Sequence, residues 1–202
     1  MLAQIFLVRH GQTAWSVSGQ HTSRTEVPLT PEGEWGAQRL AGPLRGLKLT
    51  ATFTSPRQRA RQTCELAGLG AGMAIEPDLA EWEYGEYEGL RSSEILARRP
   101  GWNLFRDGCP GGESPAQVSA RADRLIARLR GLGGNIALFS HGHFGRVLAA
   151  RWSELPILAG QRLGLDPASL SILGYEHHDP GSPVIALWNA RGDCEMVGAA
   201  RV

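Results

Sequence analysis

Two short apolar runs, at residues 5–8 and 136–139, constrain most strongly how this chain can fold. Each run is brief, is built from branched or aromatic side chains and ends abruptly in polar residues, which is typical of a buried strand. Along the chain such strand patterns alternate with helical patterns. This alternation favours a largely parallel sheet with helices on both faces. We therefore expect an α/β fold with three layers, α/β/α, around a mostly parallel central sheet.

The expected elements follow from these periodicities. Strands are predicted over residues 3–9, 51–54, 73–76, 135–140, 169–175 and 184–188, and helices over residues 31–46, 56–68, 92–99, 114–131 and 143–152. Ser55 and Ser114 each precede a proline and stand three residues before a glutamine, which predicts a capping box at the start of a helix. Segments 108–112 and 177–183 are expected to be surface loops.

Composition limits the classes of protein to which the chain can belong. Its 202 residues suit a single domain over 1–202, and its 21 basic and 20 acidic residues nearly cancel. We therefore expect no nucleic acid and no membrane as a partner. The three cysteines form no CxxC pair and the first apolar run is too short for a signal peptide, so a reducing, cytoplasmic location is expected. The oligomeric state stays open, a homo-oligomer included.

A histidine followed by glycine stands at the end of each apolar run. His10 follows the first run through Arg9, and His141 follows the second through Ser140. The tripeptide Arg9-His10-Gly11 alone would suit a charged strand exit equally well. Because the carboxyl ends of parallel strands meet at the edge where α/β sheets bind ligands, we expect the two imidazoles to lie within a few ångströms of each other.

Arg57 and Glu81 are the residues that we expect beside the two histidines. Arg57 falls in the first turn of a predicted helix, where N–H groups favour an anion, and with Arg9 it offers forked donors for phosphoryl oxygens. Arg61, one turn later, is expected to be a structural ion-pair partner. Glu81 directly follows an apolar segment, and burial there would favour the protonated form that a proton donor needs. Solvated positions are expected for Glu83, Glu86 and Glu88.

The order of these motifs resembles the histidine phosphatase superfamily, which includes cofactor-dependent phosphoglycerate mutases. The resemblance rests on Leu7-Val8-Arg9-His10-Gly11-Gln12-Thr13, Pro28-Leu29-Thr30 with Gly33, Thr54-Ser55-Pro56-Arg57 with Arg61-Gln62-Thr63, Leu79-Ala80-Glu81 with Gly85 and Glu88-Gly89, Gly112-Glu113-Ser114, and Ser140-His141-Gly142. Segments such as Glu81-Trp82-Glu83-Tyr84-Gly85 are similar to actinobacterial broad-specificity acid phosphatases, and also to a fungal sugar-bisphosphatase of the same superfamily.

The resemblance implies a role for each residue. His10 would be the nucleophile that becomes phosphorylated, Glu81 the proton donor and acceptor, and His141 would hold phosphoryl oxygens together with the two arginines. Neither a metal nor a cofactor is implied, and the partner would be a small phosphorylated metabolite. Phosphate or substrate contacts are expected from Gly11, Gln12, Ser16, Thr22, Ser23, Tyr84 and Gly142, and a leaving-group pocket from His21, Trp82, Tyr84, Trp102 and His143.

Three other activities remain to be weighed against a metal-independent phosphomonoesterase. A mutase would return the phosphoryl group to substrate, but the mutases carry a longer insertion between the positions of Glu81 and His141, and its absence favours hydrolysis. A metallohydrolase would use His10, His141 and His143 as ligands, although aspartates usually complete such sites. A non-catalytic binder of phosphorylated ligands would have lost the nucleophile or the acid, and both are present. The natural substrate stays open, and a sugar-bisphosphatase with narrow specificity is a further alternative.

Overall fold

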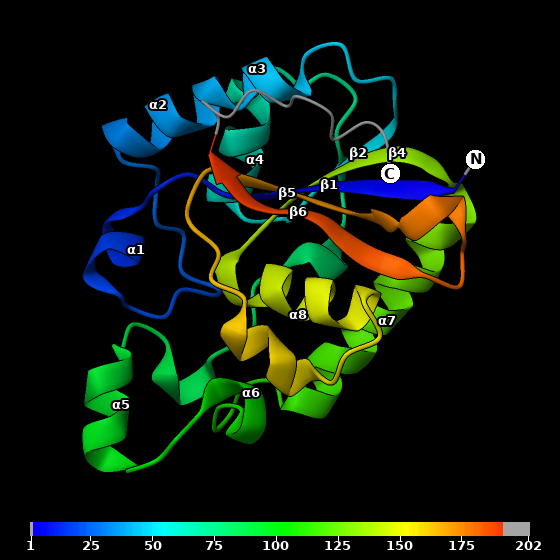
Figure 1. The fold of residues 1–202 in the computed structure, drawn as a ribbon. Helices are drawn as coiled ribbons and strands as arrows, with labels where there is room; N and C mark the ends of the chain where they lie inside the picture. The colour runs from blue at the N-terminus through cyan, green and yellow to red at the C-terminus, as the bar shows by residue number, and fades with distance from the viewer. Residues whose placement is uncertain (1, 192–202) are drawn as a thin grey trace.

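A six-stranded sheet forms the centre of the protein (Figure 1) in the computed structural model, which describes residues 2–191. The strand order is β3-β2-β4-β1-β5-β6. Strands β1 to β4 are mutually parallel, whereas β5 runs antiparallel to both β1 and β6. The mostly parallel sheet is therefore confirmed. The strands are β1 (Ala3–Arg9), β2 (Leu49–Thr54), β3 (Ala74–Ile75), β4 (Gly134–Ser140), β5 (Ser169–Tyr175) and β6 (Pro183–Arg191).

Helices cover both faces of this sheet (Figure 1). Because side chains of a strand alternate between faces, Ile5 and Leu7 of β1 pack in the core beneath α7 and α8, while Phe6 and Val8 pack in the core beneath α2 to α4. This arrangement confirms the three layers. The helices are α1 (Ala14–Ser18), α2 (Pro31–Arg39), α3 (Ala41–Leu44), α4 (Gln58–Leu66), α5 (Ser92–Arg98), α6 (Leu104–Asp107), α7 (Pro115–Leu132) and α8 (Gly142–Trp152).

The register between β1 and β4 positions the two histidines. Arg9 pairs with Ser140, the last residues of their strands, and the backbone N–H of His10 donates to the carbonyl oxygen of Ser140 at 2.9 Å. His10 and His141 therefore leave the sheet side by side. Within residues 2–191, no helix has the length and apolar character that crossing a membrane requires.

Two predicted helices differ from the structure. The helix expected over residues 31–46 is divided into α2 and α3, because Pro43 has no N–H to donate to the carbonyl of Arg39. The helix expected from residue 56 begins at Gln58, and Arg57 occupies its N-cap position without a capping side chain. Ser55 is therefore not the cap that its sequence pattern predicts. The capping box of Ser114 with Gln117 on α7 is confirmed.

Two short helices, α1 and α6, are absent from the sequence-based prediction. Thr13 and Ser16 form a capping box at α1, and Asn103 caps α6 by accepting from the N–H of Phe105. Figure 1 shows α1, α5 and α6 at the end of the sheet toward which β1 runs. These short elements therefore surround the edge of the sheet where the two histidines lie.

Candidate active site

The imidazole rings of His10 and His141 form the centre of the site. Their centroids lie 5.1 Å apart with an interplanar angle of 62°. The Nδ1–H of His10 donates to the carbonyl oxygen of Gly11 at 2.7 Å, which leaves Nε2 as the atom with a free lone pair. Nε2 of His141 lies 2.7 Å from Oγ of Ser55, and its Nδ1 is buried without a partner among residues 2–191. Each ring therefore has one nitrogen held by the protein and one left for a ligand.

Burial and positive charge keep both rings neutral. Burial lowers the pKa of His10 well below its ordinary value, and the nearby charges of Arg59 and Arg9 lower it further. The pKa of His141 is lowered well below its ordinary value by burial, by Arg59 and by His10. A neutral imidazole retains the lone pair that a nucleophile needs. His10 is thus prepared for attack on an electrophile.

Unpaired nitrogen donors surround these rings. Six buried side-chain N or O atoms of the described residues have no hydrogen-bond partner, and four of them belong to Arg9, Arg57, Arg59 and His141. Buried polar atoms are almost always paired, so such a group of donors requires an explanation. A tetrahedral anion with several oxygens supplies acceptors for all of them. The site is therefore suited to a phosphoryl group.

Arg59 is the residue of this group that the sequence analysis missed. Its guanidinium is fully buried and donates to the carbonyl oxygens of Thr22, Ser23 and Thr25 at 3.0 to 3.1 Å. A signal for it was present, because Arg59 and Thr63 share one face of α4 at helical spacing. The guanidinium thus joins the loop over residues 22–25 to the histidine pair.

Arg57 lies farther toward the surface than its expected role requires. Its side chain is 27% exposed, lies 3.6 Å from Glu26 and donates to the carbonyl of Arg24. Its charge also lowers the pKa of His141, although burial, Arg59, His10 and Arg9 have larger effects. A role for Arg57 at the phosphoryl group stays a prediction. Arg61 is exposed and forms no ion pair with another described residue, so its expected structural pairing is wrong.

Glu81 is held in a fixed orientation at the amino end of α8. One carboxylate oxygen, Oε1, accepts from the backbone N–H groups of Trp82 and Phe144 at 2.9 and 2.7 Å. The other, Oε2, accepts from the N–H of His143 at 3.0 Å. Only 8% of Glu81 is exposed, and it borders the same cavity as His10. Oε2, with a single protein donor, is the oxygen with capacity left for proton transfer.

An ion pair fixes the segment that carries Glu81. The guanidinium of Arg121 donates to the carbonyl oxygens of Asp78 and Ala80 at 2.8 and 2.7 Å and pairs with Glu113 at 2.7 Å. Glu113 accepts in turn from the N–H of Glu83 at 2.9 Å. The chain on both sides of Glu81 is therefore tied to α7 and to the residue that precedes its cap.

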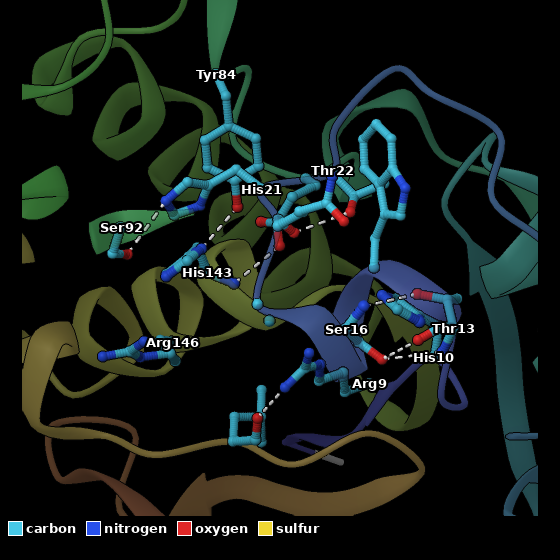
Figure 2. Close-up of a pocket in the computed structure, with 16 residues that line it drawn as sticks. Arg9, His10, Thr13, Ser16, His21, Thr22, Tyr84, Ser92, His143 and Arg146 are labelled. Atoms are coloured by element: carbon cyan, nitrogen blue, oxygen red, sulfur yellow. Dashed lines mark hydrogen bonds between the residues drawn. The ribbon is translucent and has the colours of Figure 1, made fainter. Parts of the chain in front are cut away.

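A cavity of about 190 Å³ opens beside His10. It contains several of the predicted contacts, and Figure 2 shows Arg9, His10, Ser16, Thr22 and Tyr84 around it. His141 and Arg59 are buried beside this cavity rather than on its wall. The predicted contact residues that line it are Ser16, Thr22, Tyr84 and Gly142, together with His21 and His143.

Three predicted substrate contacts have other partners. Gln12 accepts from the hydroxyl of Thr30 at 2.8 Å and lies outside the cavity. The hydroxyl of Ser23 donates to Glu88 at 2.5 Å. Gly11 is required for packing, since a Cβ there would lie 2.4 Å from the carbonyl oxygen of Gly33. The side chains of Gln12 and Ser23 are thus engaged within the protein, and the expected phosphate or substrate contacts of Gly11, Gln12 and Ser23 stay predictions.

Glu88 is also not the solvated residue that its surroundings in the sequence predict. Its carboxylate accepts from the N–H groups of Ser23 and Thr25. Burial acts to raise the pKa of Glu88, but these hydrogen bonds outweigh it and lower the pKa below its ordinary value. Glu88 therefore orders the loop over residues 22–25 next to Arg59.

Aromatic and imidazole rings form the wall of the cavity away from His10. The hydroxyl of Tyr84 lies 2.6 Å from Nδ1 of His143, and the ring of His21 lies 4.6 Å from that of Tyr84. Trp102 packs edge-on against His21 at 5.8 Å. Trp82 is instead fully buried and donates to the carbonyl of Glu113, so its expected place in the pocket is wrong.

The candidate metal ligands do not form a metal site. No group of three or more histidine, cysteine, aspartate or glutamate side chains within residues 2–191 is placed to hold an ion. The arrangement therefore does not support the metallohydrolase alternative.

Comparison with known proteins adds to this geometry. The profile of the histidine phosphatase superfamily (branch 1) matches residues 5–191. The chain is 45% identical over 179 residues to an acid phosphatase of Mycobacterium tuberculosis, covering 86% of this chain and 87% of that one. It is 39% identical over 183 residues to sedoheptulose 1,7-bisphosphatase of Saccharomyces cerevisiae, covering 75% and 68%. A solved structure of an open reading frame product of Mycobacterium tuberculosis superposes with a TM-score of 0.87 at 39% identity, covering 94% and 98%.

Proposed function

The chain belongs to the histidine phosphatase superfamily (branch 1), and we propose that it hydrolyses the phosphomonoesters of small metabolites through a phosphohistidine on His10, without a metal ion. The observation that carries this proposal is the group of buried, unpaired nitrogens on Arg9, Arg57, Arg59 and His141 around a neutral histidine. They can hold the three non-bridging oxygens of a phosphoryl group while His10 attacks.

The first step forms a bond between Nε2 of His10 and phosphorus. The bond from phosphorus to the ester oxygen breaks, and the leaving oxygen takes a proton from Glu81. The bond from Nδ1 of His10 to the carbonyl of Gly11 keeps the nucleophilic nitrogen aimed at phosphorus and disperses the charge that develops on the ring.

The second step regenerates the enzyme. Glu81, now ionised, accepts a proton from water, and the oxygen of that water attacks the phosphorus of phosphohistidine. The bond between phosphorus and Nε2 breaks, and inorganic phosphate leaves. In both steps the arginines stabilise the negative charge on the phosphoryl group, as magnesium does in many other phosphoryl-transfer enzymes.

The decisive experiment compares His10→Asn with His177→Asn, which removes an exposed imidazole, 90% accessible, far from the site. We expect His10→Asn to lower turnover of p-nitrophenyl phosphate by at least about 10³-fold, and to abolish an acid-labile phosphoenzyme. His177→Asn should retain full turnover. Normal turnover by His10→Asn would disprove the nucleophile.

Two further measurements separate this proposal from its rivals. Wild-type activity should persist in excess EDTA, and loss of activity that zinc or magnesium restores would favour a metal-dependent reaction. Rapid isomerisation of 3-phosphoglycerate with a 2,3-bisphosphoglycerate primer would identify a mutase instead. A ranking of metabolite phosphates by kcat/KM would then narrow the substrate.

A further inference from the structure

A second, larger cavity adjoins the one beside His10. Its volume is about 450 Å³, and His21, Ser92, His143 and Arg146 border both cavities. A substrate with its phosphoryl group at His10 would therefore extend its leaving group past these four side chains. The second cavity, which we term the outer cavity, is the place where leaving groups can be distinguished.

Positive charge dominates the lining of the outer cavity. Arg146 and Arg162 both border it, and its described lining residues include neither an aspartate nor a glutamate. Its remaining polar side chains, among them Asn103 and Gln161, are neutral. A cavity lined by charge of one sign concentrates ligands of the opposite sign. The outer cavity is therefore suited to an anion.

Arg146 is held in place for such a ligand. Its Nε donates to the carbonyl oxygen of Gly160 at 2.9 Å and its Nη2 to that of Gln161 at 2.7 Å. The guanidinium also lies 4.8 Å above the ring of Phe105. These contacts fix the group and leave Nη1 as the terminal nitrogen for a bound molecule. Figure 2 shows Arg146 beside His143, on the side of the pocket away from Thr13 and His10.

His143 supplies a second donor between the two cavities. The hydroxyl of Tyr84 lies 2.6 Å from Nδ1 of His143, and burial raises the pKa of Tyr84, so the phenol keeps its proton and can donate it to that nitrogen. With Nδ1 as the acceptor, the neutral ring carries its proton on Nε2. The ring then offers an N–H to an oxygen of the leaving group.

We infer that the outer cavity binds a second anionic group, a carboxylate or a phosphate, at the end of the leaving group opposite the scissile phosphoryl group. Arg146 would be the anchor for that anion, and His143 would donate to the oxygens between the two ends. This inference rests on the proposed function and narrows its substrate class to phosphomonoesters with two anionic ends.

Matched substrate pairs test the inference. The first pair is 3-phosphoglycerate and glycerol 3-phosphate, which differ in a carboxylate at the distal end. The second is fructose 1,6-bisphosphate and fructose 1-phosphate, which differ in a distal phosphate. In at least one pair we expect the doubly anionic member to have a kcat/KM about 10-fold higher or more. The pair that shows the preference identifies the chemistry of the distal anion.

Three variants test whether the preference for doubly anionic substrates arises from the outer cavity. Arg146→Gln should lower the ratio of kcat/KM within the preferred pair by about 10- to 100-fold, mainly through a higher KM for the doubly anionic member. Arg162→Gln changes an exposed arginine at the same cavity, and it should lower the ratio by about 3-fold without a packing defect. Arg98→Gln, which removes an exposed charge on α5 outside both cavities, should leave the ratio unchanged.

The outcomes also separate this inference from the proposed function. No preference in either pair, or a ratio that neither Arg146→Gln nor Arg162→Gln alters, would overturn the outer anion site while phosphatase activity stands. If the wild-type protein forms no phosphohistidine and turns over no phosphomonoester, the proposed function itself fails. Circular dichroism and the Tm of each variant show whether a lost ratio comes from misfolding.

Discussion

Nε2 of His141 lies 2.7 Å from Oγ of Ser55, the residue that follows β2. Nδ1 of the same ring is the nitrogen left for a ligand. The hydroxyl of Ser55 determines whether this Nδ1 carries a proton, and so whether it donates to or accepts from the ligand. When the hydroxyl donates to Nε2, the proton of the neutral ring resides on Nδ1 and can be donated to a phosphoryl oxygen. We therefore predict that Ser55 acts on a bound phosphoryl group through His141.

Ser55→Ala removes this control of the His141 tautomer. We expect kcat to fall by about 10-fold, with the Tm nearly unchanged, because the smaller side chain still fits the site. Ser153→Ala is the matched control, since its buried hydroxyl has no partner among the described residues. Steady-state kinetics and differential scanning calorimetry provide the comparison, and equal kcat values for the two variants would remove Ser55 from the site.

Arg59 and Arg57 differ in burial, and their variants should differ in effect. Arg59→Gln leaves the carbonyls of residues 22, 23 and 25 without a donor and takes a charge from beside His10, so we expect a loss of at least about 10³-fold in kcat/KM. Arg57→Gln should lose about 10-fold. A larger loss for Arg57→Gln would restore Arg57 as the principal phosphate ligand.

Glu81→Gln keeps the shape of the side chain but cannot donate a proton as an acid. We expect turnover of alkyl phosphates, whose alkoxide leaves poorly, to fall by about 10²- to 10⁴-fold. Turnover of p-nitrophenyl phosphate should fall much less in the first step, because its leaving group needs little protonation. Burst kinetics separate phosphorylation from hydrolysis, and an equal slowing of phosphorylation for both esters would contradict the acid role.

The lowered pKa of His10 has a consequence for the pH dependence of phosphorylation. A histidine with an ordinary pKa loses its lone pair below pH 6.5, whereas His10 should stay neutral well below that pH. The rate of phosphoenzyme formation at saturating substrate should therefore show no tenfold loss per unit between pH 6.5 and 5.5. Rapid-quench measurements would reveal such a loss if the imidazole titrated near 6.5.

His21 should make the fold less stable in acid. Burial lowers its pKa to about 4, so the unfolded chain binds a proton at a pH where the folded protein does not. Above pH 6.5 His21 is neutral in both the folded and the unfolded protein, so it has little effect on the free energy of unfolding. Below pH 6.5 the free energy of unfolding falls by about 1.4 kcal/mol per pH unit, until the pH reaches the pKa of His21 in the folded protein. Urea unfolding at pH 6.5 and 5.0 should show a drop about 2 kcal/mol smaller in His21→Gln than in the wild type. Equal drops would show that His21 does not contribute.

The sheet and the histidine pair could be predicted because their signals are local. A strand that is apolar on both faces and is followed by a histidine can be predicted from its own residues alone. Residues 5–8 and 136–139 both have this pattern. Pro43, the cause of the division between α2 and α3 at Leu40, is also a local signal, but the helical pattern on both sides of it predicts one continuous helix.

The rest of the site depends on tertiary contacts. The motif at Ser55 predicts a helix cap, yet its hydroxyl is taken by His141, a residue far along the chain. Arg57 is the N-cap of α4 and Arg59 lies in its first turn, and the local sequence does not show that Arg59 is the more deeply buried of the two. Arg146 acquires its place through carbonyls of the segment Ile157–Arg162, for which no sequence pattern was available.

The pairing of Arg9 with Ser140 places the reacting histidines at the centre of the sheet, away from the residues that contact the leaving group. The reacting groups stand on the central seam of the sheet, where a change would disturb both cores at once. The outer cavity is bordered by the short helices α5 and α6, which contribute Ile95, Leu104 and Phe105 to the core on one face of the sheet only. Substitution of exposed lining residues such as Leu96 can therefore change which leaving group is bound, while the phosphoryl chemistry remains as it was.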